Sequence, residues 1–297
     1  MRLLIAGWQG QTAQALIEVA PSRVDIEACA IGRPALDICE VRTIERALND
    51  IKPDIIINTA AYTDVDKAEL EAEHAMAANC EGARLLAVSS AKRGIPILHL
   101  STSYVFDGTS NVPYSESDAA APVTVYGATK FAGEAAVQAA NPKHIILRTA
   151  WVYSALGRNF VTSILQQARA GKPLRVVADQ YGSPTYAPHL VEVMLAIAAR
   201  TATIGDHDEM PWGVYHAAGS GRASWYEMAR EALRNASDVR HLVDHVEPIT
   251  SEQYSTRMQR PVQSELDCSK LERAFGLRLP DWQDGVTQCV GRLEVNG

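Results

Sequence analysis

Short apolar segments alternate with longer amphipathic segments from the first residue to about residue 200. A short apolar run bounded by turn residues indicates a buried strand, whereas apolar residues at the spacing of a helical turn indicate a helix. The predicted strands are Leu3–Ala6, Val24–Ile31, Asp54–Asn58, Ile95–Ser101, His144–Thr149 and Leu174–Ala178. The predicted helices are Gln11–Val19, Thr43–Asp50, Ala72–Arg93, Val125–Ala140 and Phe160–Ala170. This alternation is typical of repeated βαβ units, whose parallel strands share one sheet.

The fold class that this order predicts is α/β, with a doubly wound parallel sheet and a second, smaller mixed α/β domain. After residue 200 the alternation fades, although Met210–Ala217 has the pattern of a strand, and Trp225–Asn235 and Ser269–Phe275 have that of helices. We interpret residues 1–150 with about 173–200 as the sheet domain. Residues about 151–172 with 201–297 are then the smaller domain.

A glycine-containing turn, Gly7-Trp8-Gln9-Gly10-Gln11-Thr12-Ala13, follows the first predicted strand and opens the first predicted helix. A residue without Cβ lets the backbone approach a pyrophosphate, and the free N–H groups of a helix N-terminus attract that anion. In this context G-x-x-G-x-x-A matches the dinucleotide-binding fingerprint. We therefore predict that Gly7, Gly10, Gln11 and Thr12 bind NAD(P), and that the sheet domain is Rossmann-like. A plain tight turn is the alternative.

The end of the second predicted strand bears on the choice of coenzyme. An NAD site usually places an acidic residue there, on the ribose 2′-hydroxyl. This strand ends in Ile31-Gly32-Arg33 without an acid, and Arg33 is placed to pair with a 2′-phosphate. The sequence therefore favours NADP(H), with NAD(H) as the alternative and a plain surface role for Arg33 as the other. Asp37 and Ile38 follow in a loop that we expect near the adenine, although Asp37 also suits a turn.

Tyr126 and Lys130 lie four residues apart at the start of a predicted helix, on one helix face. A nearby positive charge lowers the pKa of a phenol, which suits proton transfer near neutral pH. Thr102 follows the fourth predicted strand at the carboxyl edge of the sheet, where α/β folds bind ligands. A tyrosine and a lysine at this spacing are common in helices, so it is their conjunction with the glycine turn and Thr102 that predicts a catalytic site.

With these residues in place, the sequence resembles the extended short-chain dehydrogenase/reductase family, in its sugar-nucleotide reductase branch. The likeness covers nearly the whole chain. The motifs that carry it are Gly32-Arg33-Pro34-x-Leu36-Asp37, Pro53-Asp54-x-Ile56-Ile57-Asn58-x-Ala60-Ala61-x-Thr63, Ser101-Thr102-x-Tyr104-Val105-Phe106, Val125-Tyr126-Gly127-x-Thr129-Lys130, Arg148-Thr149-x-Trp151-Val152-Tyr153, Asp179-Gln180-Tyr181-Gly182-Ser183-Pro184-Thr185 and Arg260-Pro261.

The resemblance implies a reductase that transfers hydride from NAD(P)H to the C4 carbonyl of a dTDP-linked 4-keto-6-deoxy sugar. It implies that Tyr126 protonates the C4 oxygen, that Lys130 binds the nicotinamide ribose and tunes Tyr126, and that Thr102 orients the carbonyl. The remaining implied contacts are with the cofactor for Ala60, Ala61 and Thr63, and with the substrate for Ser103, Tyr104, Trp151, Asn159 and Arg260, the arginine at the diphosphate.

One position departs from the family pattern. The family commonly has Thr-Asp-Tyr after the fourth strand, whereas this chain has Thr102-Ser103-Tyr104. The missing carboxylate puts in doubt whatever it contributes to substrate handling. Structural alternatives also stand for two residues, a core aromatic for Trp151 and a surface ion pair for Arg260.

Two other functions stay open at this level. One is a noncatalytic NADP-binding regulatory subunit, because the same subfamily includes the β subunit of methionine adenosyltransferase. The other is a reductase of a different nucleotide 4-keto sugar, since pocket shape decides the base and the stereochemistry. Retention of Thr102, Tyr126 and Lys130 together favours chemistry over regulation.

The composition restricts the partners and the cellular compartment that we expect for the protein. The 297 residues carry 28 basic and 35 acidic side chains, a formal charge of −7, so we expect no nucleic-acid or anionic-membrane partner. Five scattered cysteines form no C-x-x-C pair and favour a reducing cytoplasm. No histidine pattern has metal-ligand spacing, so no metal is assigned. We expect no membrane span, and a homodimer as the commonest oligomer.

Overall fold

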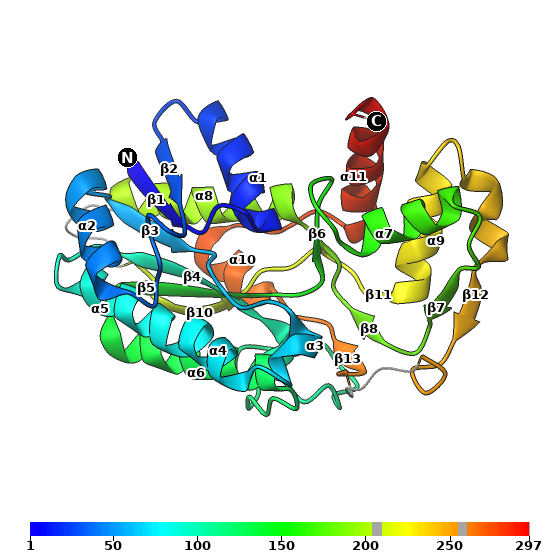
Figure 1. Cartoon of the computed structure of the whole chain (residues 1–297), viewed down its shortest axis with the longest axis horizontal. Coiled ribbons are helices and arrows are strands. Elements are labelled where there is room, and N and C mark those ends of the chain that lie inside the picture. Colours follow the sequence, from blue (N-terminus) through cyan, green and yellow to red (C-terminus); the bar gives the residue numbers. More distant parts are fainter. Residues whose placement is uncertain (204–209, 255–259, 297) are drawn as a thin grey trace.

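The computed structural model describes residues 1–203, 210–254 and 260–296. Its centre is a six-stranded parallel sheet with the strand order β10-β5-β4-β3-β1-β2 (Figure 1). These strands are β1 (Arg2–Ala6), β2 (Glu27–Ile31), β3 (Ile55–Asn58), β4 (Ile97–Thr102), β5 (His144–Thr149) and β10 (Gly213–His216). The order reverses between β1 and β3, as in a doubly wound fold, so the α/β prediction is confirmed.

Helices cover both faces of this sheet, and alternate residues of each strand supply the two cores. Leu3 and Ile5 of β1 pack with α1 (Gln11–Val19) and α8 (Ala187–Thr203). Leu4 and Ala6 face the opposite layer, which holds α2 (Val41–Ile51), α5 (Ala83–Ala91) and α6 (Val125–Ala140). Because both faces are buried, the strands read as continuous apolar runs.

The helical segment before β4 is interrupted, whereas the apolar spacing predicted one helix over Ala72–Arg93. The chain forms α3 (Val65–Ala68), α4 (Ala72–Met76), a π-helical turn η2 (Ala77–Gly82) and then α5. At Gly133 of α6 a Cβ would lie 2.0 Å from the Asn79 carbonyl oxygen, so η2 presses directly on α6. The buried Asn79 side chain there holds the backbone of Tyr62 and the hydroxyl of Thr129.

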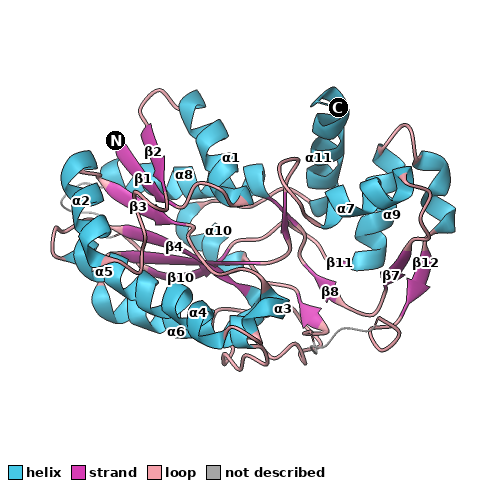
Figure 2. Ribbon diagram, viewed as in Figure 1, coloured by secondary structure: helices cyan, strands magenta, loops and turns pink. Residues whose placement is uncertain are grey.

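A second region with its own apolar core lies beyond the carboxyl edge of the sheet (Figure 2). Its helices are α7 (Phe160–Arg169), α9 (Trp225–Asn235) and α11 (Trp282–Asn296), and α10 (Ser269–Phe275) packs on β10 instead. Its short strands pair as β7 (Arg175–Val177) with β12 (Glu247–Ile249), β6 (Val152–Tyr153) with β9 (Thr185–Tyr186), and β8 (Tyr181–Gly182) with β11 (Ala223–Ser224) and β13 (Gln263–Ser264). Short 3-10 turns are η1 (Ala20–Ser22), η3 (Ser103–Val105) and η4 (Arg240–His245).

Two sequence predictions of strands are wrong in part. The segment Leu174–Ala178 contains β7, but β7 pairs with β12 and not with the central sheet, whose sixth strand is β10 within Met210–Ala217. Similar apolar runs suit either sheet, because burial and not the partner sets the pattern. The strand predicted from Val24 begins at Glu27, since Pro21 lies in η1 and Val24 is 99% exposed. Helices α8 and α11 were not predicted.

The described helices include none that is long and apolar enough to cross a membrane.

Candidate active site

The turn after β1 is packed tightly against its neighbours. Gly7 has a φ of 101°, which L side chains rarely adopt, and its N–H donates to the Ile31 carbonyl at 2.8 Å. A Cβ on Gly7 would lie 2.9 Å from Oγ1 of Thr59. The turn therefore depends on glycine here, and it brings the ends of β1, β2 and β3 together.

The N-terminus of α1 is open to a ligand. Gly10 is its N-cap residue, makes no side-chain cap, and has nothing within 4 Å of the place of a Cβ. The first turn holds no acidic residue, so the positive end of the helix dipole is not neutralised by its own side chains. Thr12 is buried, and Gln11 Nε2 lies 3.4 Å from the Val152 carbonyl of β6, which links α1 to the second region.

The residues after β2 are divided between the surface and the core. Arg33 is exposed, so its guanidinium is accessible to a charged group of a ligand. The Asp37 carboxylate accepts the N–H of Cys39 at 2.9 Å, which is the turn role that the sequence left open. The side chain of Ile38 is buried in the core beside Gly82, away from the surface where the sequence led us to expect it.

The loop after β3 lies beside the glycine turn. Ala60 and Ala61 are half-buried and Thr63 is exposed. The Ala60 N–H donates to Oδ1 of Asn58 at 3.1 Å, which fixes the beginning of this loop to the end of β3. All these segments follow the carboxyl ends of neighbouring strands, the edge at which α/β proteins bind ligands.

Thr102 and Tyr126 are brought together as the sequence predicted. Thr102 ends β4 and caps η3, where its Oγ1 accepts the N–H of Tyr104 at 3.2 Å. Tyr126 lies in the first turn of α6, whose N-cap Thr124 accepts the N–H of Gly127 at 2.9 Å. A Cβ on Gly127 would lie 2.0 Å from the Tyr104 carbonyl oxygen, so α6 begins directly against η3.

Burial raises the pKa of the Tyr126 phenol to about 12, while its hydrogen bond with Thr102 acts in the opposite direction. The sequence led us to expect a pKa lowered by Lys130. The structure differs because the Lys130 ammonium is turned toward β4, where Nζ donates to the Leu100 carbonyl at 2.7 Å. At neutral pH the phenol therefore carries its proton, which is the form of a general acid.

Lys130 is 2% exposed, and its burial lowers its pKa from 10.5 to about 8. Its Nζ also lies 3.3 Å from Nε2 of His99, a buried residue of β4. Burial and the neighbouring Lys130 together lower the pKa of His99 well below its usual value. Sequence reasoning missed His99, although a histidine within an apolar strand, three residues before Thr102, was a usable signal.

The hydroxyl of Ser103 is buried without a hydrogen-bond partner among the described residues. The same is true of Oγ1 of Thr149, which ends β5 in register with Thr102. Buried hydroxyl groups normally have a hydrogen-bond partner. Both hydroxyls are therefore polar groups at this edge of the sheet that can still form a hydrogen bond.

Arg260 reaches from the second region to the cofactor side. Its Nη2 donates to Oδ2 of Asp66 in α3 at 3.0 Å, while its buried Nε has no partner among the described residues. Burial raises the pKa of Tyr104, and the Arg260 guanidinium opposes that rise. Arg260 therefore lies near the residues that follow β4, with a donor still unused.

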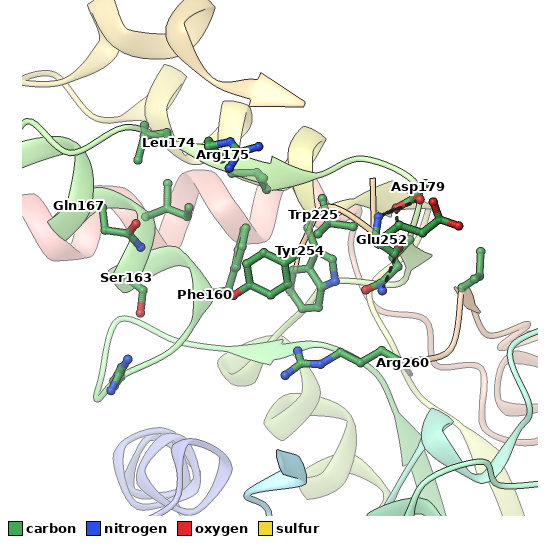
Figure 3. Close-up of a pocket in the computed structure, with 17 residues that line it drawn as sticks. Phe160, Ser163, Gln167, Leu174, Arg175, Asp179, Trp225, Glu252, Tyr254 and Arg260 are labelled. Atoms are coloured by element: carbon green, nitrogen blue, oxygen red, sulfur yellow. Dashed lines mark hydrogen bonds between the residues drawn. The ribbon is translucent and has the colours of Figure 1, made fainter. Parts of the chain in front are cut away.

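A cleft of about 1050 Å³ opens in the second region (Figure 3). The rings of Phe160, Trp225 and Tyr254 gather in its middle, and the Arg260 side chain extends below them. Its other lining residues are Arg158, Ser163, Ile164, Gln167, Leu174, Arg175, Val176, Val177, Asp179, Gln180, Ser251, Glu252 and Val262. Thr102, Tyr126 and Lys130 do not line it, whereas Arg260 does and also acts on the pKa of Tyr104.

Trp151 and Asn159 support the cleft without lining it. Trp151 stacks on Trp225 with centroids 3.6 Å apart, behind the ring that faces the cleft. Asn159 is the N-cap of α7: its Oδ1 accepts the N–H of Thr162, and its Nδ2 donates to the Ser154 carbonyl. It positions Phe160, the next residue. Phe160, Trp225, Tyr254, Arg158 and Arg175 were missed from the sequence, because no local motif joins these separate segments.

Among the described residues, no group of three or more His, Cys, Asp or Glu side chains is arranged to hold a metal ion.

Comparison with known proteins gives a consistent set of relatives. The family model described as the RmlD substrate binding domain matches residues 1–295. A dTDP-4-dehydrorhamnose reductase of Sinorhizobium fredii is 43% identical over 297 residues, covering 100% of this chain and 99% of the relative. The crystal structure of a dTDP-4-dehydrorhamnose reductase from Clostridium acetobutylicum is similar with a TM-score of 0.90 and 32% identity, covering 99% of this chain and 100% of that one. That of the Bacillus anthracis enzyme, in complex with NADP, has a TM-score of 0.86 and 32% identity, covering 100% and 99%.

Proposed function

The chain belongs to the RmlD family, and we propose that it reduces the 4-keto group of dTDP-4-dehydro-6-deoxy-L-mannose to give dTDP-L-rhamnose, using NAD(P)H. The observation that carries the proposal is the hydrogen bond between Thr102 and a protonated Tyr126 at the edge of the sheet that also holds the glycine turn. The buried Lys130 lies one helical turn after Tyr126. A reduction of this kind requires a proton donor beside a dinucleotide site.

The residues present fit a dinucleotide. Gly7 lets the turn pack against the loop after β3, and the uncapped α1 N-terminus that follows it, open at Gly10, is suited to a pyrophosphate. Ala60, Ala61 and Thr63 would flank the bound molecule. The exposed Arg33 would pair with a 2′-phosphate, which favours NADP(H) over NAD(H). When bound, the coenzyme supplies the hydride that is added to C4 of the sugar.

The chain's own residues supply the proton. The phenol of Tyr126 donates its proton to the C4 oxygen, and the Thr102 hydroxyl orients the same oxygen by a hydrogen bond. Lys130 holds a second proton one helical turn further along α6. Because Tyr126 is protonated at neutral pH, this arrangement acts in the direction of reduction without first having to take up a proton.

The cleft in the second region suits the nucleotide portion of the substrate. Its aromatic rings provide a stacking surface for a pyrimidine base. Arg158, Arg175 and Arg260 bring guanidinium groups that bind phosphate oxygens in pairs. With the diphosphate on the unused Nε of Arg260, the sugar would extend past Tyr104 toward Tyr126. Ser103 would face it with a hydroxyl where the family commonly has a carboxylate.

We also propose the setting in which the enzyme works. The five cysteines are free and the net charge is −7, which favours a reducing cytoplasm and argues against a nucleic-acid partner. A homodimer is the assembly we expect. We propose a division into two domains that follows the two cores. Helix α8 and strand β10 go with residues 1–150, and β7, α9 and α11 go with the substrate-binding part. It differs from the division made from the sequence at β7, which leaves the sheet domain, and at β10, which joins it.

The experiment that tests the function is a panel of nucleotide 4-keto sugars, each assayed with NADPH and with NADH by the loss of reduced nicotinamide absorbance. We expect oxidation of the coenzyme with the dTDP-linked 4-keto-6-deoxy sugar, faster with NADPH. Tight coenzyme binding without turnover on any sugar would instead identify a noncatalytic binding subunit. Turnover only on a sugar linked to another nucleotide would change the substrate and leave the reductase.

A further inference from the structure

A line of buried polar side chains runs behind Lys130, away from the substrate side. Lys130 Nζ lies 3.3 Å from Nε2 of His99, and Nδ1 of His99 lies 3.0 Å from Nδ2 of Asn58. Asn58 and His99 are each 1% exposed. The line ends at the backbone N–H of Ala60, in the loop beside the glycine turn.

The Ala60 N–H determines which ring nitrogen of His99 carries the proton. A backbone N–H is only a donor, so Oδ1 of Asn58, at 3.1 Å, is the acceptor. The amide nitrogen of Asn58 then faces Nδ1 of His99, which has to accept. Burial keeps the imidazole neutral, and its single proton is therefore on Nε2.

This N–H of His99 faces the nitrogen of Lys130. An ammonium group offers only donors, whereas a neutral amine offers one lone pair. The His99 donor thus matches the amine form of Lys130 and opposes the ammonium form, while the Leu100 carbonyl accepts a hydrogen bond from either.

We propose that Asn58 and His99 are positioning residues that favour release of the Lys130 proton to Tyr126 during reduction. The inference rests on the proposed function. When Tyr126 has given its proton to the sugar oxygen, its phenolate has to recover a proton. The Lys130 ammonium, one helical turn further along α6, gives up a proton for this recovery and becomes an amine, and Tyr126 becomes a phenol again. The resulting amine accepts the His99 N–H until it takes a proton from solvent.

Few other charges act on Lys130. Glu134 of the same helix favours its ammonium form, but Glu134 is itself paired with Arg148 of β5 at 2.7 Å. Tyr104 of η3 acts on Tyr126. From η2, the uncharged Asn79 binds Thr129. At the α3 side, Asp66 pairs with Arg260, and the Glu69 carboxylate accepts the N–H of Val125 at the start of α6. Lys67–Asp64 and Arg84–Glu81 pair at the surface.

The first test needs no substrate. Nitrogen-15 NMR of histidine-labelled wild-type protein separates the two neutral tautomers and the imidazolium by the shifts of the ring nitrogens. We expect His99 to carry its proton on Nε2 at neutral pH. A proton on Nδ1, or an imidazolium, would overturn the inference even if the enzyme proves to be the proposed reductase.

The second test is Asn58→Asp, which keeps the acceptor for Ala60 and replaces the donor facing His99 with a carboxylate oxygen. His99 should then carry its proton on Nδ1, and Nε2 should accept from the Lys130 ammonium. We expect the titration of Lys130, followed by NMR of labelled lysine, to move up by about one pH unit or more. At pH 7, kcat should fall about tenfold with KM little changed.

Asn141→Asp is the matched control, because Asn141 is equally buried and its side chain binds Ser90, Ile95 and Lys143, outside this line. It should leave the Lys130 titration in place. Equal titrations in the folded Asn58→Asp and wild-type proteins would refute the inference. If Asn58→Asp does not fold, the wild-type tautomer still decides it. A wild type with the expected tautomer and no activity on any sugar would refute the proposed function alone.

Discussion

The cofactor side and the cleft side of the molecule hold their polar groups in different ways. Beside the sheet, Lys130 and His99 are almost completely buried, and each has fixed partners on regular elements. In the cleft, Arg158, Arg175 and Tyr254 are exposed on turns and short strands. The first arrangement suits the exact placement of one proton, and the second suits the binding of a large, flexible nucleotide. Substitutions on the two sides should therefore affect different kinetic constants.

The largest expected effect is the loss of the proton donor. Tyr126→Phe should lower kcat by about 10²- to 10⁴-fold, the usual contribution of a general acid, and leave NADPH affinity within a few-fold. Steady-state rates and a coenzyme titration measure the two quantities. Tyr114→Phe removes another buried phenol, bonded to Asp107 at 2.6 Å, and should keep its turnover. A near wild-type rate in Tyr126→Phe would exclude Tyr126 as the acid.

On the cleft side, Arg260→Ala should mainly raise KM. Loss of a charged hydrogen bond to the diphosphate is worth about 1.5–3 kcal/mol, which corresponds to roughly 10- to 100-fold in KM. The control is Asp66→Asn, which breaks the same exposed ion pair and should change KM only a few-fold. Equal effects of the two substitutions would mean that Arg260 acts only through Asp66.

A smaller effect, on the preference between the two coenzymes, is expected at Arg33, which is exposed on the cofactor side. Arg33→Ala should reduce the preference for NADPH over NADH by about tenfold, because an exposed charge pair is partly screened. The ratio of the two kcat/KM values measures it. Arg42→Ala removes an equally exposed charge from α2 and should preserve the ratio. An unchanged ratio in Arg33→Ala would show that another group meets the 2′-phosphate.

The smallest effect concerns stability on the cofactor side. Burial, with Arg148 nearby, lowers the pKa of His216 from 6.5 to about 3. Between these values the unfolded chain binds a proton that the folded chain does not, so the free energy of unfolding falls as the pH falls. The contribution is at most about 1.4 kcal/mol per pH unit. Denaturant titrations from pH 6.5 to 5 should show a shallower slope for His216→Gln than for wild type, and an unaltered slope for the exposed His74→Gln.

The contrast between the cofactor side and the cleft side also explains which parts of the structure could be predicted from the sequence. Most strands and helices of the sheet were visible because each buries an apolar run or stripe of its own. The glycine turn, Thr102 and Tyr126 each follow a strand or open a helix, so their meeting followed from the topology. Helix α8 was missed, although Leu190, Val191 and Met194 lie on one buried face at a helical spacing.

The cleft could not be predicted from the sequence. Strands β6, β8, β9, β11 and β13 have two residues each, too few to show a period, and their pairing joins distant segments. The protonation of Lys130 and Tyr126 was also hidden. It depends on burial and on the direction in which Nζ points, and residue spacing states neither.

Gly182 of β8 lies outside the cleft, and a substitution there should change the shape of the cleft. A methyl group at this residue would lie 2.6 Å from Cε2 of Trp151, whose backbone already has a φ of 45°. The indole would have to shift, and the stacked Trp225 would shift with it. Gly182→Ala should thus change the size of the ligand that the cleft accepts, without replacing any residue that lines it.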